Sequence, residues 1–202
     1  MSSQPPESPG YRPYDQDNDP HNKDLESEPE EITAEAGEDP DVPHPVNWRT
    51  LTAEDAEYEW LALNEWVDWL RRTFGLPASV VPPAWHRHPE LVWELSALHL
   101  HWLGAYDPAQ HASAPIGWLA DFHQAQGRLR EWVALSGTRL DRDRPTRQTI
   151  WPGEGPEPTA VEAPIVNRDE EFVAFVIADL NRRADAEAEF LRRGETDPQE
   201  RP

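Results

Sequence analysis

Tryptophan is distributed unevenly along this 202-residue chain, and this distribution limits where a folded domain can lie. All ten tryptophans fall between Trp48 and Trp151, so none lies in the first 47 residues or the last 51. They cluster around residues 82–90, which read PPAWHRHPE. Because tryptophan is large and carries one N–H donor, so dense a run marks a packed core, a recognition surface, or both.

Residues 1–43 have the composition of a disordered leader. They hold 13 acidic residues against Arg12 and Lys23, together with eight prolines. Such a segment cannot bury enough apolar surface to offset the entropy of the chain. The whole chain carries a net charge of −21, which repels nucleic acid. We expect the leader either to keep the protein soluble or to dock on a basic partner.

Several protein classes are excluded by what the sequence lacks. No cysteine is present, so disulfides, thiolate chemistry and cysteine-containing zinc sites are ruled out. The opening residues, MSSQPP, lack the basic and apolar regions of a signal peptide, and charges interrupt the apolar runs. Neither a phosphate-binding glycine loop nor a nucleophile elbow occurs. We therefore expect a cytoplasmic protein that is not an enzyme, needs no cofactor and inserts into no membrane.

Four segments with apolar residues at helical spacing predict an all-α fold: a small three-helix core plus a C-terminal helix. The first helix is predicted from the N-cap Thr52 to a stop at Gly75. The second is predicted to begin at Pro89. The remaining two are predicted to run from Pro115 to Gly137 and from Asn167 to Gly194. The domain organisation that follows is a leader (1–43), a Trp-rich helical domain (44–137), a Pro-rich linker (138–166), an amphipathic helix (167–194) and a disordered tail (195–202).

Two His-X-His pairs are the metal candidates of the sequence. On a helix, residues two apart point about 200° apart, so His99 and His101 cannot share one ion there. His86 and His88 precede the second predicted helix and could do so. We expect these histidines instead to cap, to stack on tryptophan or to face solvent. A metal-dependent enzyme that uses His86 and His88 is the alternative.

One stretch of the chain is locally basic. Within twenty residues it holds six arginines: Arg128, Arg130, Arg139, Arg142, Arg144 and Arg147. Acidic residues are interspersed among them, which predicts a salt-bridged helix end and loop, or a partner for the acidic leader. The alternative is a phosphate contact, which would make the protein a DNA-associated regulator. Because the rest of the chain repels a polyanion, we favour the salt-bridged interpretation over a nucleic-acid partner.

The tryptophans divide into those that helical spacing explains and those that it does not. Four fall on predicted core stripes: Trp60, Trp102, Trp118 and Trp132. Prolines frame Trp85, which either packs back between helices or, with Arg87, anchors a protein partner. Trp66, Trp93 and Trp151 lie off the main stripes or in the linker. The candidate protein-contact residues are therefore Trp85, Arg87, Trp93, Trp66 and Trp151.

The motifs around these tryptophans resemble an actinobacterial family, domain of unknown function 4913. The resemblance spans about residues 48–135 and lies in four motifs: WLALNEWVDW (60–69), PPAW (82–85), HPELVWEL (88–95) and WLGAY (102–106). It implies an accessory protein of a mobile genetic element, such as a conjugative plasmid, integrative element or prophage, and implies no catalytic residue. We expect such a protein to act through protein–protein contact, with a partner and an oligomeric state that the sequence does not specify.

Overall fold

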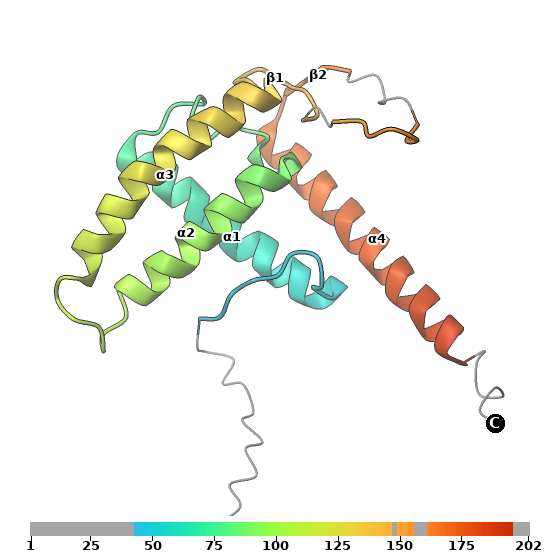
Figure 1. Cartoon of the computed structure of the whole chain (residues 1–202), viewed down its shortest axis with the longest axis horizontal. Helices are drawn as coiled ribbons and strands as arrows, with labels where there is room; N and C mark the ends of the chain where they lie inside the picture. The colour runs from blue at the N-terminus through green and yellow to red at the C-terminus, as the bar shows by residue number, and fades with distance from the viewer. Residues whose placement is uncertain (1–42, 147–148, 156–160, 196–202) are drawn as a thin grey trace, which may run out of the picture. The chain divides into compact units, whose positions relative to one another are not determined.

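Four helices dominate the described chain and confirm the all-α class (Figure 1). The computed structural model describes residues 43–146, 149–155 and 161–195, which all belong to one compact unit of residues 40–202. The predicted leader (except Pro43), Arg147 and the tail beyond Glu195 lie outside the described residues. The helices are α1 (Ala53–Phe74), α2 (Pro89–Ala105), α3 (Ala114–Ser136) and α4 (Arg168–Glu195). A 3-10 turn, η1 (Trp85–Arg87), precedes α2.

The helix ends follow the local signals of the sequence. Thr52 caps α1, its hydroxyl accepting a hydrogen bond from the Asp55 N–H. Gly75 and Gly137 end α1 and α3 with φ angles of 60° and 76°, a left-handed conformation that favours glycine. Asn167 caps α4, as the capping-box spacing predicts. Two boundaries differ by one residue: α3 begins at Ala114 and α4 ends at Glu195.

The helices pack as two pairs, α2 with α3 and α1 with α4. The contact between α1 and α2 joins the two pairs. In Figure 1, α2 and α3 lie side by side, α1 crosses α2, and α4 packs along α1. The Trp60 indole donates to Asp179 and the Ala53 N–H donates to Glu187, so α4 runs antiparallel to α1. The predicted C-terminal helix is thus part of the core, to which it contributes Phe172 and Val176.

A short two-stranded sheet joins the loop after α3 to the start of α4. Strands β1 (Arg142–Asp143) and β2 (Ala163–Pro164) pair antiparallel, with Arg142 opposite Pro164 and Asp143 opposite Ala163. The sequence predicted no strand, because two-residue strands are too short to show alternation. This pairing holds the proline-rich linker next to the helical core at both of its ends.

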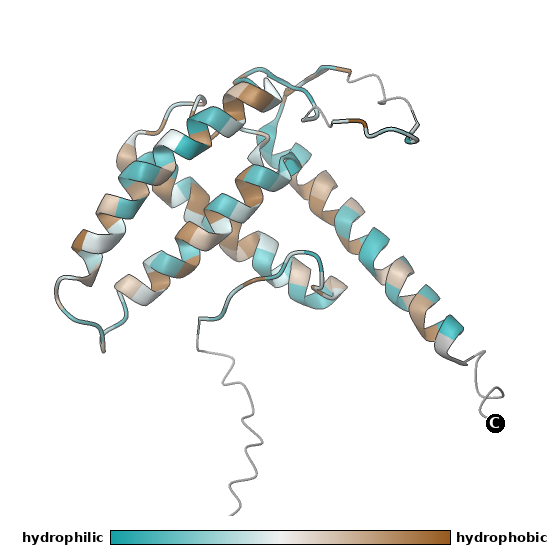
Figure 2. Ribbon diagram, viewed as in Figure 1, coloured by the Kyte–Doolittle hydropathy of each residue, from teal (hydrophilic) through white to brown (hydrophobic). Residues whose placement is uncertain are grey.

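One assignment to the core was wrong. Trp132 was placed on a core stripe, yet it is substantially exposed. The reason is that α3 packs mainly on α2, with Phe74 of α1 against Trp118 and Phe122, so a narrower stripe that includes Leu129 is covered. Apolar residues also recur along the whole of α4 (Figure 2). Among the described helices, none combines the length and the apolar character needed to cross a bilayer.

Candidate binding site

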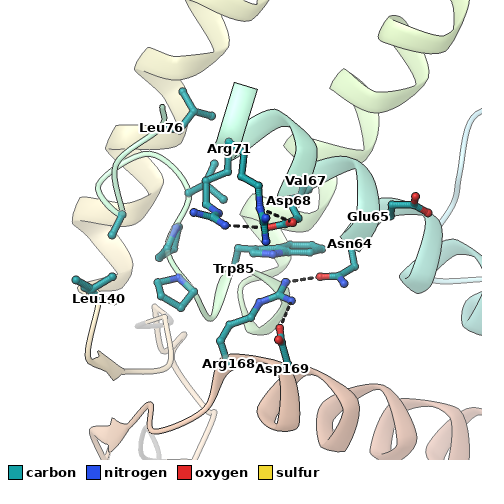
Figure 3. Close-up of a pocket in the computed structure, with 15 residues that line it drawn as sticks. Asn64, Glu65, Val67, Asp68, Arg71, Leu76, Trp85, Leu140, Arg168 and Asp169 are labelled. Atoms are coloured by element: carbon teal, nitrogen blue, oxygen red, sulfur yellow. Dashed lines mark hydrogen bonds and ion pairs between the residues drawn. The ribbon is translucent and has the colours of Figure 1, made fainter. Parts of the chain in front are cut away.

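A cavity of about 620 Å³ opens between the second half of α1, the connector that follows it, and the first turn of α4 (Figure 3). Its apolar lining is made of Val67, Leu76, Val81, Pro82, Pro83, Trp85 and Leu140. Pro82 and Pro83 restrict the backbone of the connector, so this wall is rigid before any ligand binds. A preformed hollow with apolar walls is the usual form of a binding site.

Trp85 forms the floor of this cavity. The residue is only 1% exposed, and its ring lies 6.2 Å from Trp60 and 6.3 Å from Phe172 between ring centres. Of the two interpretations of this residue, packing between helices is therefore the one that the structure favours, and an exposed anchor is wrong. Trp85 still borders the cavity, but so little of it is accessible that a ligand there would rest mainly on the residues around it.

Charged side chains from α1 line one side of the cavity. Arg71 Nη2 lies 2.7 Å from Asp68 Oδ1, and Arg72 Nε lies 2.8 Å from Asp68 Oδ2. Hydrogen bonds from Arg71, and to a lesser extent Arg72, hold the pKa of Asp68 below its usual value despite partial burial. Two guanidinium groups thus share the Asp68 carboxylate, and Glu65 on the same helix balances the second positive charge.

The first turn of α4 supplies a third arginine on the opposite side. Arg168 donates to the Asn64 amide oxygen, lies 3.1 Å from Asp169, and sits 5.0 Å above the Phe172 ring. Glu65 also borders the cavity but points away from Trp85 in Figure 3. Three arginines and three carboxylates (Glu65, Asp68 and Asp169) therefore line the cavity, so its formal charges balance on a chain whose net charge is strongly negative.

His86 and His88, the metal candidates, lie buried behind this site in separate hydrogen-bond networks. His86 Nε2 lies 3.2 Å from Glu171, while Nδ1 has no partner among the described residues. Burial, with the nearby charges of Arg168 and Arg87, lowers the pKa of His86 to about 3, so this ring is neutral. Within the described ranges no three His, Asp or Glu side chains group as a metal site would require.

His88 bridges the start of α2 to the loop after α3. Its Nε2 lies 2.8 Å from Asp143 and its Nδ1 lies 2.9 Å from the Thr146 hydroxyl. That hydroxyl donates to Glu90 at 2.5 Å, so it accepts from His88 and cannot act as a nucleophile activated by this ring. Although burial alone would raise the pKa of Asp143, the hydrogen bond and charge of His88 lower it. The role of His88 is therefore structural, because it joins the start of α2 to the loop after α3.

The basic stretch is largely engaged within the molecule. Arg128 forms a forked hydrogen bond with Glu94, Arg142 pairs with Asp141 and Glu162, and Arg144 donates to the Ser136 carbonyl. Arg130 donates to Gln126, Arg139 is exposed, and Arg147 lies outside the described residues. The structure therefore resolves a salt-bridged helix end and loop, in agreement with the first interpretation of this stretch.

The remaining candidate residues do not meet at the cavity. Trp66 is buried, which contradicts its assignment as a contact residue. Trp93 and Trp151 are exposed but lie outside the lining, and Arg87 pairs with Glu171. Sequence reasoning missed Asp68, Arg71 and Arg72 as site residues, although their three- and four-residue spacing was visible. Leu140 and Arg168 gave no local signal, because only the tertiary fold brings them there.

Two aromatic clusters flank the site. The closed cluster consists of Trp48, Trp60, Trp85, Phe172 and Phe175, and α4 covers it. The open cluster consists of Trp66, Trp69, Phe74, Trp102 and Tyr106. These residues lie in the C-terminal half of α1 and at the C-terminal end of α2. In the open cluster Trp69, Phe74 and Tyr106 remain 39%, 38% and 49% exposed. Exposed aromatic rings in contact with one another are typical of interaction surfaces.

A second hollow, of about 220 Å³, lies between the start of the described chain and the α1–α2 pair. Its lining includes Glu59 and His99. Burial raises the pKa of Glu59, and burial lowers the pKa of His99 to about 4. His99 stacks on Trp66 at 4.9 Å, so its ring belongs to the packing of the open cluster.

Comparisons of the chain with models of protein families, with curated proteins and with solved structures give no match.

Proposed function

We propose that this protein is a non-enzymatic accessory protein of an actinobacterial mobile genetic element and that it acts by binding another protein. The genomic setting rests on the sequence resemblance alone. The binding role rests on the cavity bordered by Trp85, which combines rigid apolar walls with three arginines that three carboxylates balance. The absence of a nucleophile elbow and of a phosphate-binding glycine loop in the sequence is consistent with binding rather than catalysis.

The chemistry of the cavity defines the partner segment. Its apolar walls suit a leucine-sized or aromatic side chain, and the guanidinium groups of Arg71 and Arg72 suit a carboxylate, which arginine binds through two parallel hydrogen bonds. Asp68 already occupies these groups, so a ligand carboxylate would share them. The expected ligand is an extended segment that carries an apolar residue next to an aspartate or glutamate.

Selection of displayed random peptides on the full chain tests the binding role. We expect enriched peptides to share an apolar–acidic pattern and to lose binding to the Arg72→Glu protein. The matched control is Arg193→Glu, which reverses another exposed arginine at the far end of α4. Enriched peptides without that pattern, or equal binding by Arg72→Glu, would overturn the proposal.

The setting is tested separately in an actinobacterial host that carries the element. Purification of the tagged wild-type chain should retain a protein encoded by the same element, and the Arg72→Glu chain should not retain it. Retention only of host proteins, or of the same protein by both chains, would contradict an accessory role exerted through this cavity.

A further inference from the structure

α4 carries two apolar faces, of which only one is covered. Phe172 and Val176 face the core, whereas Val173 and Ile177 are each 54% exposed and Leu191 is 66% exposed. The uncovered face continues at three- and four-residue steps over the whole helix. It is called here the outer stripe of α4 and consists of the exposed Val173, Ile177, Ala184, Ala188 and Leu191, together with Leu180, which is half-buried against the core.

The outer stripe has the geometry of a helix-pairing seam. Residues at alternating steps of three and four lie within about 100° of the helix circumference. The 28-residue helix is about 42 Å long, from the rise of 1.5 Å per residue. The stripe lies beside the face that packs on α1, so a second helix can lie along it without displacing α1. An exposed stripe of this length on one helix is the form that helix-in-groove and coiled-coil partners use.

Side-chain size along the stripe suits an antiparallel copy of itself. In one antiparallel register, the numbers of facing residues sum to about 364. Ile177 then faces Glu187 and Ala188 of the second copy, and Leu180 faces Ala184. Val173 then faces Leu191. Leu180 thus meets Ala184 and Ile177 meets Ala188, which allows close packing, while the Glu187 carboxylate turns toward the Ala53 N–H. A parallel pair would place Ile177 on Ile177 and Ala184 on Ala184.

The charges along α4 favour the same direction. The first turn is acidic, with Asp169, Glu170 and Glu171, and the last turn is basic, with Arg192 and Arg193. Glu170 and Arg192 lie along the same edge of the outer stripe. An antiparallel pair brings Glu170 of each copy to Arg192 of the other, whereas a parallel pair opposes like charges. The two helix macrodipoles also oppose favourably in the antiparallel arrangement.

We infer that two copies of this chain associate through the outer stripes of α4, packed antiparallel. The interface is distinct from the Trp85 cavity and goes beyond the proposed peptide binding. Because two helices bury an area at the small end of specific interfaces, the dimer dissociates in the micromolar range.

Sedimentation velocity of the full chain over a concentration series tests the association. We expect a monomer–dimer equilibrium that Ile177→Glu shifts to monomer. Ala178→Glu, which adds the same charge one residue away on the exposed side outside the stripe, should leave it unchanged. A wild-type chain that stays monomeric throughout overturns the inference and leaves the stripe to a different protein.

Cross-linking tests the direction, and it does not depend on the folding of the Ile177→Glu variant. The chain has no cysteine, so Val173→Cys and Leu191→Cys each introduce a single thiol. These positions are about 27 Å apart along one helix. In an antiparallel pair a mixture of the two variants forms a disulfide-linked dimer, and neither variant alone does so. Cross-linking of Val173→Cys with itself would overturn the antiparallel arrangement.

Discussion

The closed and open aromatic clusters use the same kinds of residue but differ in what covers them. In the closed cluster, Trp60 lies 4.4 Å from Trp48 and 5.3 Å from Phe175 between ring centres. In the open cluster, Trp69 lies 5.1 Å from Trp102 and 6.2 Å from Phe74. Ring spacing is therefore similar, and burial is not: Trp60 is inside the protein and Trp69 is at its surface.

The difference comes from α4, which lies across the closed cluster and supplies a polar group as well as apolar ones. Asp179 accepts the Trp60 indole N–H at 3.0 Å and binds Arg183, which in turn donates to the carbonyls of Leu51 and Trp48. Burial would raise the pKa of Asp179, but the hydrogen bonds from Arg183 and Trp60 lower it. One carboxylate thus joins α1, α4 and the segment before α1.

The largest difference between the clusters should appear on truncation of one tryptophan in each. Trp60→Ala removes a buried ring and leaves a cavity, so we expect a loss of about 3–5 kcal/mol in the free energy of unfolding. Trp69→Ala removes a half-exposed ring and should cost about 1 kcal/mol. Urea denaturation followed by circular dichroism measures both. Equal losses would mean that α4 does not cover the closed cluster in solution.

Asp179→Ala tests the polar part of that cover and should have an intermediate effect. It leaves the Trp60 N–H unpaired and deprives the half-buried Arg183 of its carboxylate, which together cost about 2–3 kcal/mol. Asp179→Asn keeps an acceptor for Trp60 and should lose less. Asp185→Asn, an exposed acid on the same helix, serves as the control and should unfold like the wild type. We expect the midpoint of urea unfolding to be lowest for Asp179→Ala, higher for Asp179→Asn and highest for Asp185→Asn.

The parts that the sequence predicted are those encoded by neighbouring residues. The cap at Thr52, the stops at Gly75 and Gly137 and the start at Pro89 each depend on one residue and the helix beside it. Periodicity also identified the four helices. These signals are local, so no information from distant segments was needed.

What the sequence could not predict depends on contacts between distant segments. α4 has two apolar stripes, and periodicity alone does not say that the one with Phe172 and the polar Asp179 faces the core. The Trp85 cavity likewise needs Leu140 and Arg168 to arrive from beyond the linker. Exposure of Trp132 was missed because its stripe was assumed to be fully covered.

Each cluster also holds one histidine whose titration reports on its packing. His86 lies 5.2 Å from Phe172 in the closed cluster, and His99 stacks on Trp66 in the open one. Burial lowers the pKa of His86 from 6.5 to about 3 and that of His99 from 6.5 to about 4. Between these values and pH 6.5 the unfolded chain binds protons that the folded chain does not. The free energy of unfolding therefore falls as the pH falls below about 6.5, and it is unaffected by these groups above that pH.

His99→Phe separates the two contributions and should have the smallest effect. Phenylalanine keeps a ring stacked on Trp66 but cannot bind a proton, so the variant should lose less stability between pH 7.5 and pH 5 than the wild type, by about 1–2 kcal/mol. Urea denaturation at both pH values measures this difference, with the exposed His123→Gln as control. The pH dependence of the free energy of unfolding that remains in His99→Phe comes from His86 in the closed cluster. If His99→Phe keeps the full pH dependence, the ring of His99 is solvated and the open cluster is looser than its packing indicates.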